Sequence, residues 1–316
     1  MATMFAPHSI LKTNASDFLK DLDLTDDELL YLLDLAAAVK ASPAGYAHAL
    51  DGKNIALLFE KPSLRTKLTF DLAMKQLGGD SVFLEGPIGV REPLKDVARN
   101  LDRWTNGLVA RVFLQSTVDS LAHWSRVPVI NALSDLYPPC QALADIQTIR
   151  EHFGAGLLTG LKLAFIGDGN NVAQSLMLTS LRLGMDFALA CPQGYLPDPE
   201  IVTQAEGLAA VTGARLLITH DTAAAVDGAH AVYTDVWASM GQEQEAVERR
   251  RAFHGYQVND AIFSQARPDA VFMHCLPAKR DEEVTDSVME NLRSVVFDQA
   301  ENRLHAQKAL LLMMLT

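Results

Sequence analysis

Short, mostly apolar runs alternate with helical patterns along the whole chain. The first half carries Ile55–Phe59, which is wholly apolar, and Leu108–Phe113, and the second half repeats the order from Leu161–Ile166 onward. Short runs of this kind are typical of strands buried on both faces, and their alternation with helices favours parallel sheets. A chain of 316 residues, of which 49% are hydrophobic, is long enough for two cores. We therefore expect an α/β fold of two doubly wound domains, each a parallel sheet flanked by helices, joined by interdomain helices.

The division between the domains is expected in a long helix that runs from Pro139 to Phe153 and ends at Gly154 and Gly156. This places residues 1–150 in the first domain and residues 151–300 in the second. At the start of the chain, residues 15–41 show helical spacing, and Thr25 with Glu28 forms a capping box. At its end, a last strand is expected over 295–297, followed by a helix over 301–316.

Composition limits the classes of partner and compartment. The formal net charge of −12 argues against a nucleic acid or an anionic membrane as partner. Three cysteines, far apart and without a CxxC pair, argue against a disulfide framework and a structural zinc site. The segment Met1–Lys12 lacks a secretory pattern, and no apolar run is long enough to span a membrane. We expect a soluble, cytoplasmic protein.

The stretch Phe59–Lys67 joins a buried strand to a helix and has the features of a phosphate site. A helix that begins just after Ser63 directs free N–H groups and its positive dipole end into this loop. Ser63 and Thr66 add hydroxyl donors, and Arg65 adds a planar guanidinium that suits phosphate oxygens. An ordinary serine N-cap with solvated charges explains the loop alone equally well.

Three further loops carry polar side chains directly after predicted strands, where parallel sheets place their ligands. The loop Gly167–Val172 has the start of a dinucleotide fingerprint but lacks its third glycine, and no acidic residue follows the next strand. Its asparagines suit a small zwitterion, although helix capping is the simpler interpretation. Asp235 and Ser239 could hold an ammonium group, and His274-Cys275 points polar atoms into the same crevice. For each loop a purely structural role remains open.

Taken together, these motifs resemble the ornithine carbamoyltransferases. The resemblance covers nearly the whole chain and rests on motifs that occur in the family's order: Ser63-Leu64-Arg65-Thr66, Arg111, Pro139-Cys140-Gln141, Asp168–Asn171, Asp235–Gly241, His274–Pro277 and Glu301-Asn302-Arg303. The loop Ser239-Met240-Gly241 indicates ornithine rather than aspartate or an acylated ornithine. The resemblance implies transfer of the carbamoyl group from carbamoyl phosphate to ornithine, in arginine biosynthesis or degradation, without a metal or organic cofactor.

The resemblance also implies roles for single residues. Carbamoyl phosphate is expected in the first domain, to which the helix over 301–316 returns, and L-ornithine in the second. The expected carbamoyl-phosphate residues are Ser63, Leu64, Arg65, Thr66, Arg111, Gln141 and Arg303. The expected ornithine residues are Asn171, Asp235, Ser239 and Met240, with Cys275 and Leu276 beside the reacting δ-amine. Of these, Arg65, Arg111, Gln141 and Cys275 are expected to act in catalysis. The family assembles as trimers, with carbamoyl-phosphate sites at subunit interfaces.

Two positions depart from the family pattern. Pro138 stands where the family has a histidine that polarises the carbamoyl carbonyl, and proline offers neither a side-chain donor nor an N–H. Pro87 stands in the loop expected to reach a neighbouring subunit, where relatives often carry a polar residue, and Arg91 is the candidate to replace that contact. Loss of one oxyanion donor typically costs about 10²–10³ in rate. A non-catalytic relative that binds carbamoyl phosphate as a partner or regulatory subunit is therefore the alternative. A nicotinamide-dependent oxidoreductase is a second, weaker one.

Overall fold

The structure is a computed structural model that describes residues 10–154, 156, 158–238 and 243–316. The chain divides into two compact units, one formed by Met1–Gln147 with Glu301–Thr316 and the other by Thr148–Ala300. The division falls inside two helices, α5 (Pro139–Phe153) and α12 (Val296–Leu315). No helix in the described part of the chain is both long and apolar enough to cross a membrane.

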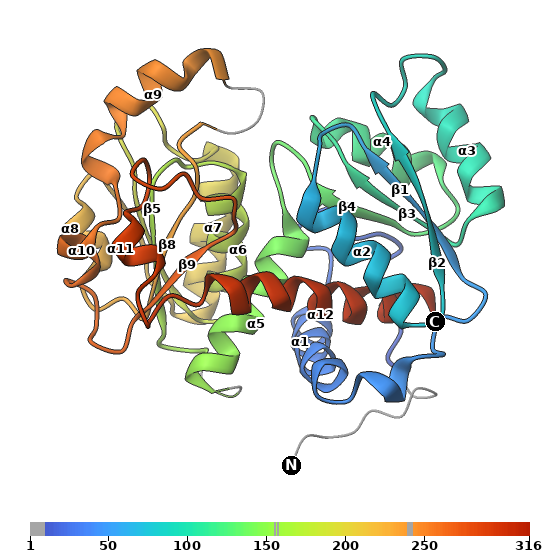
Figure 1. Cartoon of the computed structure of the whole chain (residues 1–316), viewed down its shortest axis with the longest axis horizontal. Helices are drawn as coiled ribbons and strands as arrows, with labels where there is room; N and C mark the ends of the chain where they lie inside the picture. Colours follow the sequence, from blue (N-terminus) through green and yellow to red (C-terminus); the bar gives the residue numbers. More distant parts are fainter. Residues whose placement is uncertain (1–9, 155, 157, 239–242) are drawn as a thin grey trace. The chain divides into compact units, whose positions relative to one another are not determined.

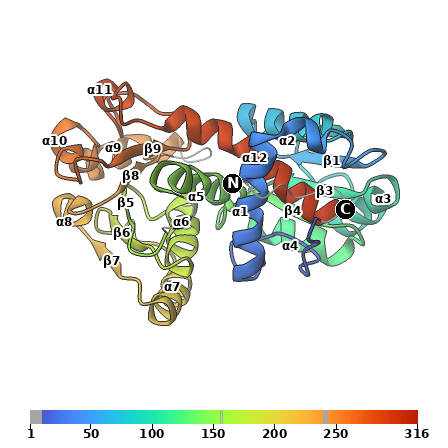
Figure 2. The ribbon, with the colours of Figure 1, turned by 90° about the horizontal axis from the view of Figure 1, so that it is seen from below.

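The described residues of the first unit contain a four-stranded parallel sheet in the order β2-β1-β3-β4. The central strand β1 is buried from Ile55 to Phe59, as its continuous apolar run predicts. Because the order reverses beside β1, the connecting helices lie on both faces: α2 covers one and α4 the other (Figure 2). The strands are β1 (Asn54–Phe59), β2 (Asp80–Glu85), β3 (Gly107–Arg111) and β4 (Val129–Leu133), and the helices are α1 (Asp26–Ala41), η2 (Pro43–Tyr46), α2 (Leu64–Gln76), α3 (Leu94–Trp104) and α4 (Gln115–Trp124).

The described residues of the second unit form a five-stranded parallel sheet in the order β7-β6-β5-β8-β9 (Figure 1). Helices α6 and α7 cover one face and α8 and α10 the other (Figure 2). The strands are β5 (Lys162–Ile166), β6 (Asp186–Ala190), β7 (Leu216–Thr219), β8 (Ala231–Thr234) and β9 (Val271–His274). The helices are α6 (Asn171–Arg182), α7 (Pro199–Thr212), α8 (Thr222–Val226), η3 (Glu243–Glu245), α9 (Ala246–Ala252), η4 (His254–Tyr256), α10 (Asp260–Phe263) and α11 (Asp286–Met289). The predicted fold class of two doubly wound α/β domains is therefore confirmed.

Two predicted elements are wrong. The strand expected over 295–297 does not form, because Val296 begins α12 and the nearest strand pairing is an isolated bridge between Phe272 and Ser294. The first predicted helix is too long: Phe18 instead forms a bridge with Ile130 at the edge of the first sheet, and α1 begins only at Asp26. Its capping box is present, with Thr25 as N-cap and Glu28 closing the turn.

Candidate active site

The first half-site lies where three neighbouring strands of the first unit end. Strand β1 pairs with β3 through Phe59 and Arg111, and β3 pairs with β4 through Arg111 and Leu133. Because parallel strands end at one edge of a sheet, this register brings the loop after Phe59, the Arg111 side chain and the segment after Leu133 to the same edge. The segment after Leu133 leads into Pro138 and α5. The register therefore brings together residues that the resemblance assigns to one ligand.

Helix α2 presents an uncapped N-terminus at this edge. Ser63 is the N-cap residue, but its hydroxyl makes no capping hydrogen bond, and the first turn contains no acidic residue. The side-chain hydrogen bond that an ordinary serine N-cap makes is therefore absent at Ser63. Such a helix end, with Arg65 in its first turn, is suited to a phosphate group. Leu64, also expected to contact ligand, is 70% exposed.

A residue from the far end of the chain completes this edge. Arg303 of α12 is buried and donates a hydrogen bond from Nη2 to the hydroxyl of Thr66, which is buried as well. In α5, the buried Gln141 donates from Nε2 to Asp145 Oδ1 over 2.7 Å. The structure thus joins Thr66 to Arg303, two residues that the resemblance assigns to the same ligand, and Asp145 holds Gln141 within its own helix.

Pro138 is buried immediately before α5, and its backbone starts the helix. Its carbonyl accepts the N–H groups of Gln141 (2.9 Å) and Ala142 (3.3 Å). The ring contributes no donor at this point. Beside it, burial raises the pKa of the Cys140 thiol to about 12, so this cysteine serves as packing rather than as a nucleophile.

Lys61 is a cation of this edge that the sequence did not single out. Its Nζ lies 4.5 Å from the centre of the Phe113 ring, two residues beyond Arg111. Burial and the positive charge of Arg111 lower the pKa of Lys61, against the opposing influence of Asp135 and Glu60. The position of Lys61 just after a predicted strand, next to the phosphate loop, is the signal that could have identified it.

The second half-site is centred on Asp235, directly after β8. Its two carboxylate oxygens accept different donors: Asn170 Nδ2 reaches Oδ2 and Cys275 Sγ reaches Oδ1, each over 3.1 Å. Strand β8 pairs with both β5 and β9, and all three strands are parallel. The three loops that supply these residues therefore begin at the same edge of the sheet. A buried carboxylate with oxygen lone pairs to spare can hold an ammonium or amine group. Asp235 and Cys275 come together as expected.

Asn170, for which the sequence left both a ligand role and helix capping open, donates a hydrogen bond to Asp235. It also caps a helix, because its Oδ1 accepts the N–H groups of Val172 and Ala173 at the start of α6. Asn171 is the first residue of α6 and is half-buried. Ser239 and Met240, also expected at the ornithine site, lie outside the described residues.

His274 supports the loop that carries Cys275 and Leu276. It is fully buried, its Nδ1 accepts the N–H of Leu276 (2.8 Å), and its Nε2 faces Glu283 Oε1 (3.3 Å). Since Nδ1 accepts, the ring proton is on Nε2. Among the described residues, the ligand atoms of Asp235, His274 and Cys275 lie within 4.8 Å of one another, as a metal would require. All three already have hydrogen-bond partners, so we interpret them as a hydrogen-bonded cluster that shapes the loop.

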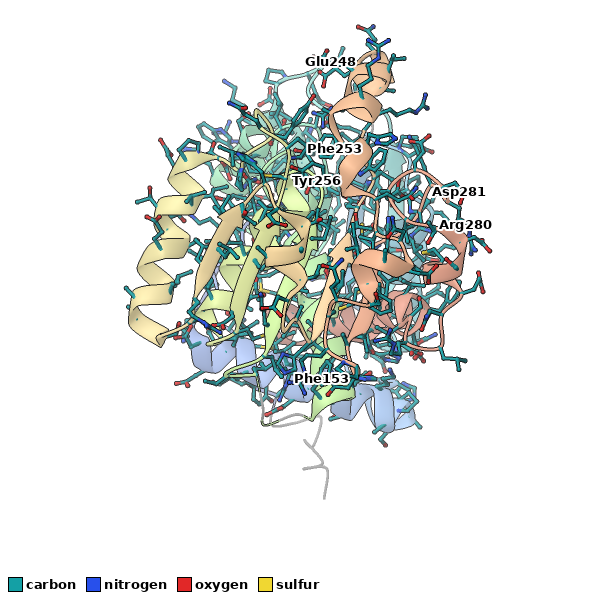
Figure 3. All side chains as sticks on the ribbon, turned by 90° about the vertical axis from the view of Figure 1, so that its left-hand side faces the viewer. Phe153, Glu248, Phe253, Tyr256, Arg280 and Asp281 are labelled. Carbon is teal, nitrogen blue, oxygen red and sulfur yellow. The ribbon has the colours of Figure 1, made fainter. Side chains whose placement is uncertain are left out.

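A cavity of about 520 Å³ lies beside Trp237 in the second unit. The other residues that line it are Arg250, His254, Gly255, Gln257, Asn259, Asp281 and Glu282. Figure 3 shows Phe253 and Tyr256 beneath α9 and Glu248 at the outer end of that helix. Neither Asp235 nor Cys275 lines this cavity, so it is separate from the carboxylate–thiol cluster.

Comparison with known proteins assigns the chain that carries these half-sites to a family. The model of the aspartate/ornithine carbamoyltransferase carbamoyl-phosphate binding domain matches residues 16–151, and that of the Asp/Orn binding domain matches residues 159–314. The chain belongs to the aspartate/ornithine carbamoyltransferase family. Arg65 and Arg111 lie in the first matched region, and Asp235 and Cys275 lie in the second, which also contains Arg303.

Members of this family resemble the chain over almost its full length. The ornithine carbamoyltransferase of Thermococcus kodakarensis is 49% identical over 294 residues, which cover 92% of this chain and 93% of the relative. That of Listeria monocytogenes is 45% identical over 313 residues, 98% of each chain. Among solved structures, the ornithine carbamoyltransferase from Pyrococcus furiosus superposes with a TM-score of 0.93 at 45% identity, covering 96% of this chain and 99% of that one.

Proposed function

We propose that this protein is an enzyme that transfers the carbamoyl group of carbamoyl phosphate to the δ-amine of L-ornithine, giving citrulline and phosphate. The observation that carries this proposal is that one member of the family contains two different half-sites, one suited to a phosphate and one suited to an amine. One unit presents an uncapped helix N-terminus with Arg65 and the Arg303–Thr66 pair, which suits a phosphate. The other presents the Asp235–Cys275 pair, which suits an amine.

The reaction needs positioning and charge stabilisation rather than a covalent intermediate. The neutral δ-amine attacks the carbonyl carbon, negative charge develops on the carbonyl oxygen, and phosphate leaves. We assign phosphate binding to Ser63, Leu64, Arg65, Thr66 and Arg303, and polarisation of the carbonyl to Arg111 and Gln141. Asn171, Asp235, Ser239 and Met240 bind ornithine, with Cys275 and Leu276 beside the amine. No cofactor takes part in these steps.

The proposed domain assignment follows the same division. Residues 1–150 with 301–316 bind carbamoyl phosphate, and residues 151–300 bind ornithine. Support for the return of 301–316 comes from the compact units, since Glu301–Thr316 groups with Met1–Gln147. The two family models support the division near residue 150, although the second model continues through residue 314. Arg303 then belongs to the phosphate half-site, although in sequence it comes after all residues of the second unit.

Pro138 gives the experiment that tests this function. We expect citrulline formation by the parent protein, and an increase of about 10²-fold in kcat when Pro138→His restores a side-chain donor. Turnover would be measured as citrulline from carbamoyl phosphate and ornithine, with Pro138→Ala as the control that removes the ring without adding a donor. A parent and a Pro138→His variant that both bind carbamoyl phosphate but form no citrulline would favour the non-catalytic carbamoyl-phosphate-binding relative.

We also propose that copies of this chain assemble through an apolar face of the first unit, as a trimer. Leu64, Leu68 and Leu72 are exposed at helical spacing along α2. Val82 and Leu84 are exposed on one face of β2, which is an edge strand of the sheet and packs against α2. An apolar face next to an unpaired strand edge is typical of an oligomer interface. A second copy is the occupant we propose because the resemblance implies trimers built at carbamoyl-phosphate sites, and Leu64 directly precedes Arg65.

A further inference from the structure

Arg249 of α9 makes an unusual number of contacts for a residue outside the half-sites. Its Nη1 donates to Asp168 Oδ2 (2.6 Å) and to the carbonyl of Trp237 (3.0 Å), and its Nε donates to Glu245 Oε2 (2.9 Å). The guanidinium carbon also lies 5.0 Å from the centre of the Tyr195 ring. The residue is only 7% exposed, so these interactions form away from bulk water.

Two of these contacts flank the hydrogen bond between Asn170 and Asp235. Asp168 lies two residues before Asn170 in the loop after β5, and Trp237 lies two residues after Asp235 in the loop after β8. One nitrogen of the guanidinium therefore bonds both loops. Since the guanidinium is planar and rigid, it fixes the spacing of the two loops, and its positive charge balances the Asp168 carboxylate.

The surroundings hold Arg249 in this place. Phe253, which is fully buried, stacks on Trp237 with ring centres 5.9 Å apart and meets Tyr195 edge-on at 4.7 Å. Figure 3 shows Phe253 directly beneath α9. Burial raises the pKa of Asp168, and the hydrogen bond from Arg249 opposes that rise and favours the carboxylate. The helix α9, the packed aromatic rings and the Arg249–Asp168 ion pair thus hold the loops after β5 and β8 together.

We propose that Arg249 is a positioning residue for the amino-acid half-site: it sets the distance between Asn170 and Asp235 and thereby the affinity for the amine substrate. This inference rests on the proposed function for the identity of that substrate. Arg249 acts through Asp168 and Trp237 and does not itself touch the reacting atoms. Glu245, which is largely exposed, orients the guanidinium from the outer side.

The experiment compares Arg249→Met and Arg249→Lys with a matched control. The control is Arg215→Met. Arg215 also pairs with an aspartate of the second unit, since its Nη2 lies 2.6 Å from Asp186 Oδ2, but this pair lies at the opposite end of the strands of the second sheet. We expect Arg249→Met to raise KM for ornithine by about tenfold to a hundredfold while KM for carbamoyl phosphate stays within about twofold. Arg249→Lys should recover part of the loss, because an ammonium keeps the charge but not the fork.

Amide hydrogen exchange measures the positioning without any substrate. In Arg249→Met, peptides that cover 167–172 and 234–238 should exchange faster than in the parent, while peptides that cover 161–164 should not. Arg215→Met should leave exchange in 167–172 and in 234–238, the two peptides at the substrate edge, unchanged. A double variant, Arg249→Met with Asp168→Asn, should raise KM for ornithine by much less than the product of the two single effects, because both remove one link.

The outcomes separate this inference from the proposed function. Unchanged exchange at both loops overturns the inference, whatever the activity, and so does an equal rise in both KM values. Faster exchange at both loops in a protein whose parent forms no citrulline supports the positioning role and rejects ornithine as the substrate.

Discussion

At the scale of single residues, the polar groups of both half-sites are held before any ligand arrives. Both oxygens of Asp235 already accept a hydrogen bond, from Asn170 and from Cys275, and Thr66 already accepts one from Arg303. A side chain fixed in this way loses little conformational freedom on binding. Ser63 is the exception, since its hydroxyl makes no capping bond.

This exception leads to a prediction for Ser63→Ala. Replacing a serine that caps a helix usually lowers the free energy of unfolding by about 1 kcal/mol. Here we expect a change within about 0.5 kcal/mol, because no capping bond is lost, together with a rise of about tenfold in KM for carbamoyl phosphate. Urea unfolding and steady-state kinetics would measure the two quantities. A protein destabilised by a full capping energy with unchanged KM would contradict the phosphate assignment.

Single residues also show where sequence reasoning ends. The spacing of Ser63, Arg65 and Thr66 follows a strand directly, so the local pattern was sufficient to propose a phosphate loop. Arg249 was missed because its partner Asp168 lies 81 positions away in the chain and its own segment is a run of charges. A charge run normally indicates a solvated helix face, and nothing local distinguishes the one arginine that is buried.

At the scale of secondary-structure elements, local chemistry decided which predictions held. The capping box of α1 was predictable because Thr25 and Glu28 satisfy each other's backbone N–H groups within one turn. The start of α12 was not, because Val295, Val296 and Phe297 have high strand propensity while tertiary packing places them at a helix N-terminus. Val295 and Val296 are buried there, and burial outweighs propensity.

The capping box gives a prediction about pH. Burial of Glu28 disfavours its charged form, but hydrogen bonds from the N–H groups of Thr25 and Asn14 and from the hydroxyls of Thr25 and Thr13 outweigh this and lower its pKa. The unfolded chain therefore binds a proton more readily, and the stabilisation by Glu28 is complete above the ordinary glutamate pKa of 4.5 and is lost as the pH falls below it.

We expect Glu28→Gln to lower the free energy of unfolding at pH 7 by about 1–2 kcal/mol and to have a smaller effect at pH 3. The measurement is urea unfolding at both pH values. Asp27→Asn is the control, because Asp27 lies in the same first helical turn but does not form the capping box. Equal destabilisation by Glu28→Gln at both pH values would show that its charge contributes nothing.

At the scale of the whole molecule, the first unit keeps an apolar face that a single copy does not bury. The two doubly wound sheets were predictable, because parallel strands carry their signal in continuous apolar runs. The exposed leucines of α2 were not recognisable from the sequence, since their spacing resembles that of any amphipathic helix. Only the burial of Phe70, Ala73 and Met74 on the same helix shows which side faces the core.

This face gives a prediction about assembly. Leu68→Glu should shift the protein to single chains and reduce turnover by about tenfold or more, because a buried charge at an interface without a partner is costly. Light scattering coupled to gel filtration, with citrulline formation measured on the same fractions, would test it. Val211→Glu, on the exposed side of α7 in the second unit, is the control and should change neither quantity. A Leu68→Glu protein that stays assembled and active would reject this face as the interface.

The return of the chain to its first unit sets an order of events during synthesis. Arg303 contacts Thr66 across 237 positions of sequence, so a ribosome must synthesise the whole second unit, Thr148–Ala300, before this contact can form. Domains made early generally fold as they emerge. The nascent N-terminal unit can thus build its sheet but not the arginine contact of its anion site. A chain that stops before α12 lacks this contact, and we expect it to bind carbamoyl phosphate more weakly than a chain that includes α12.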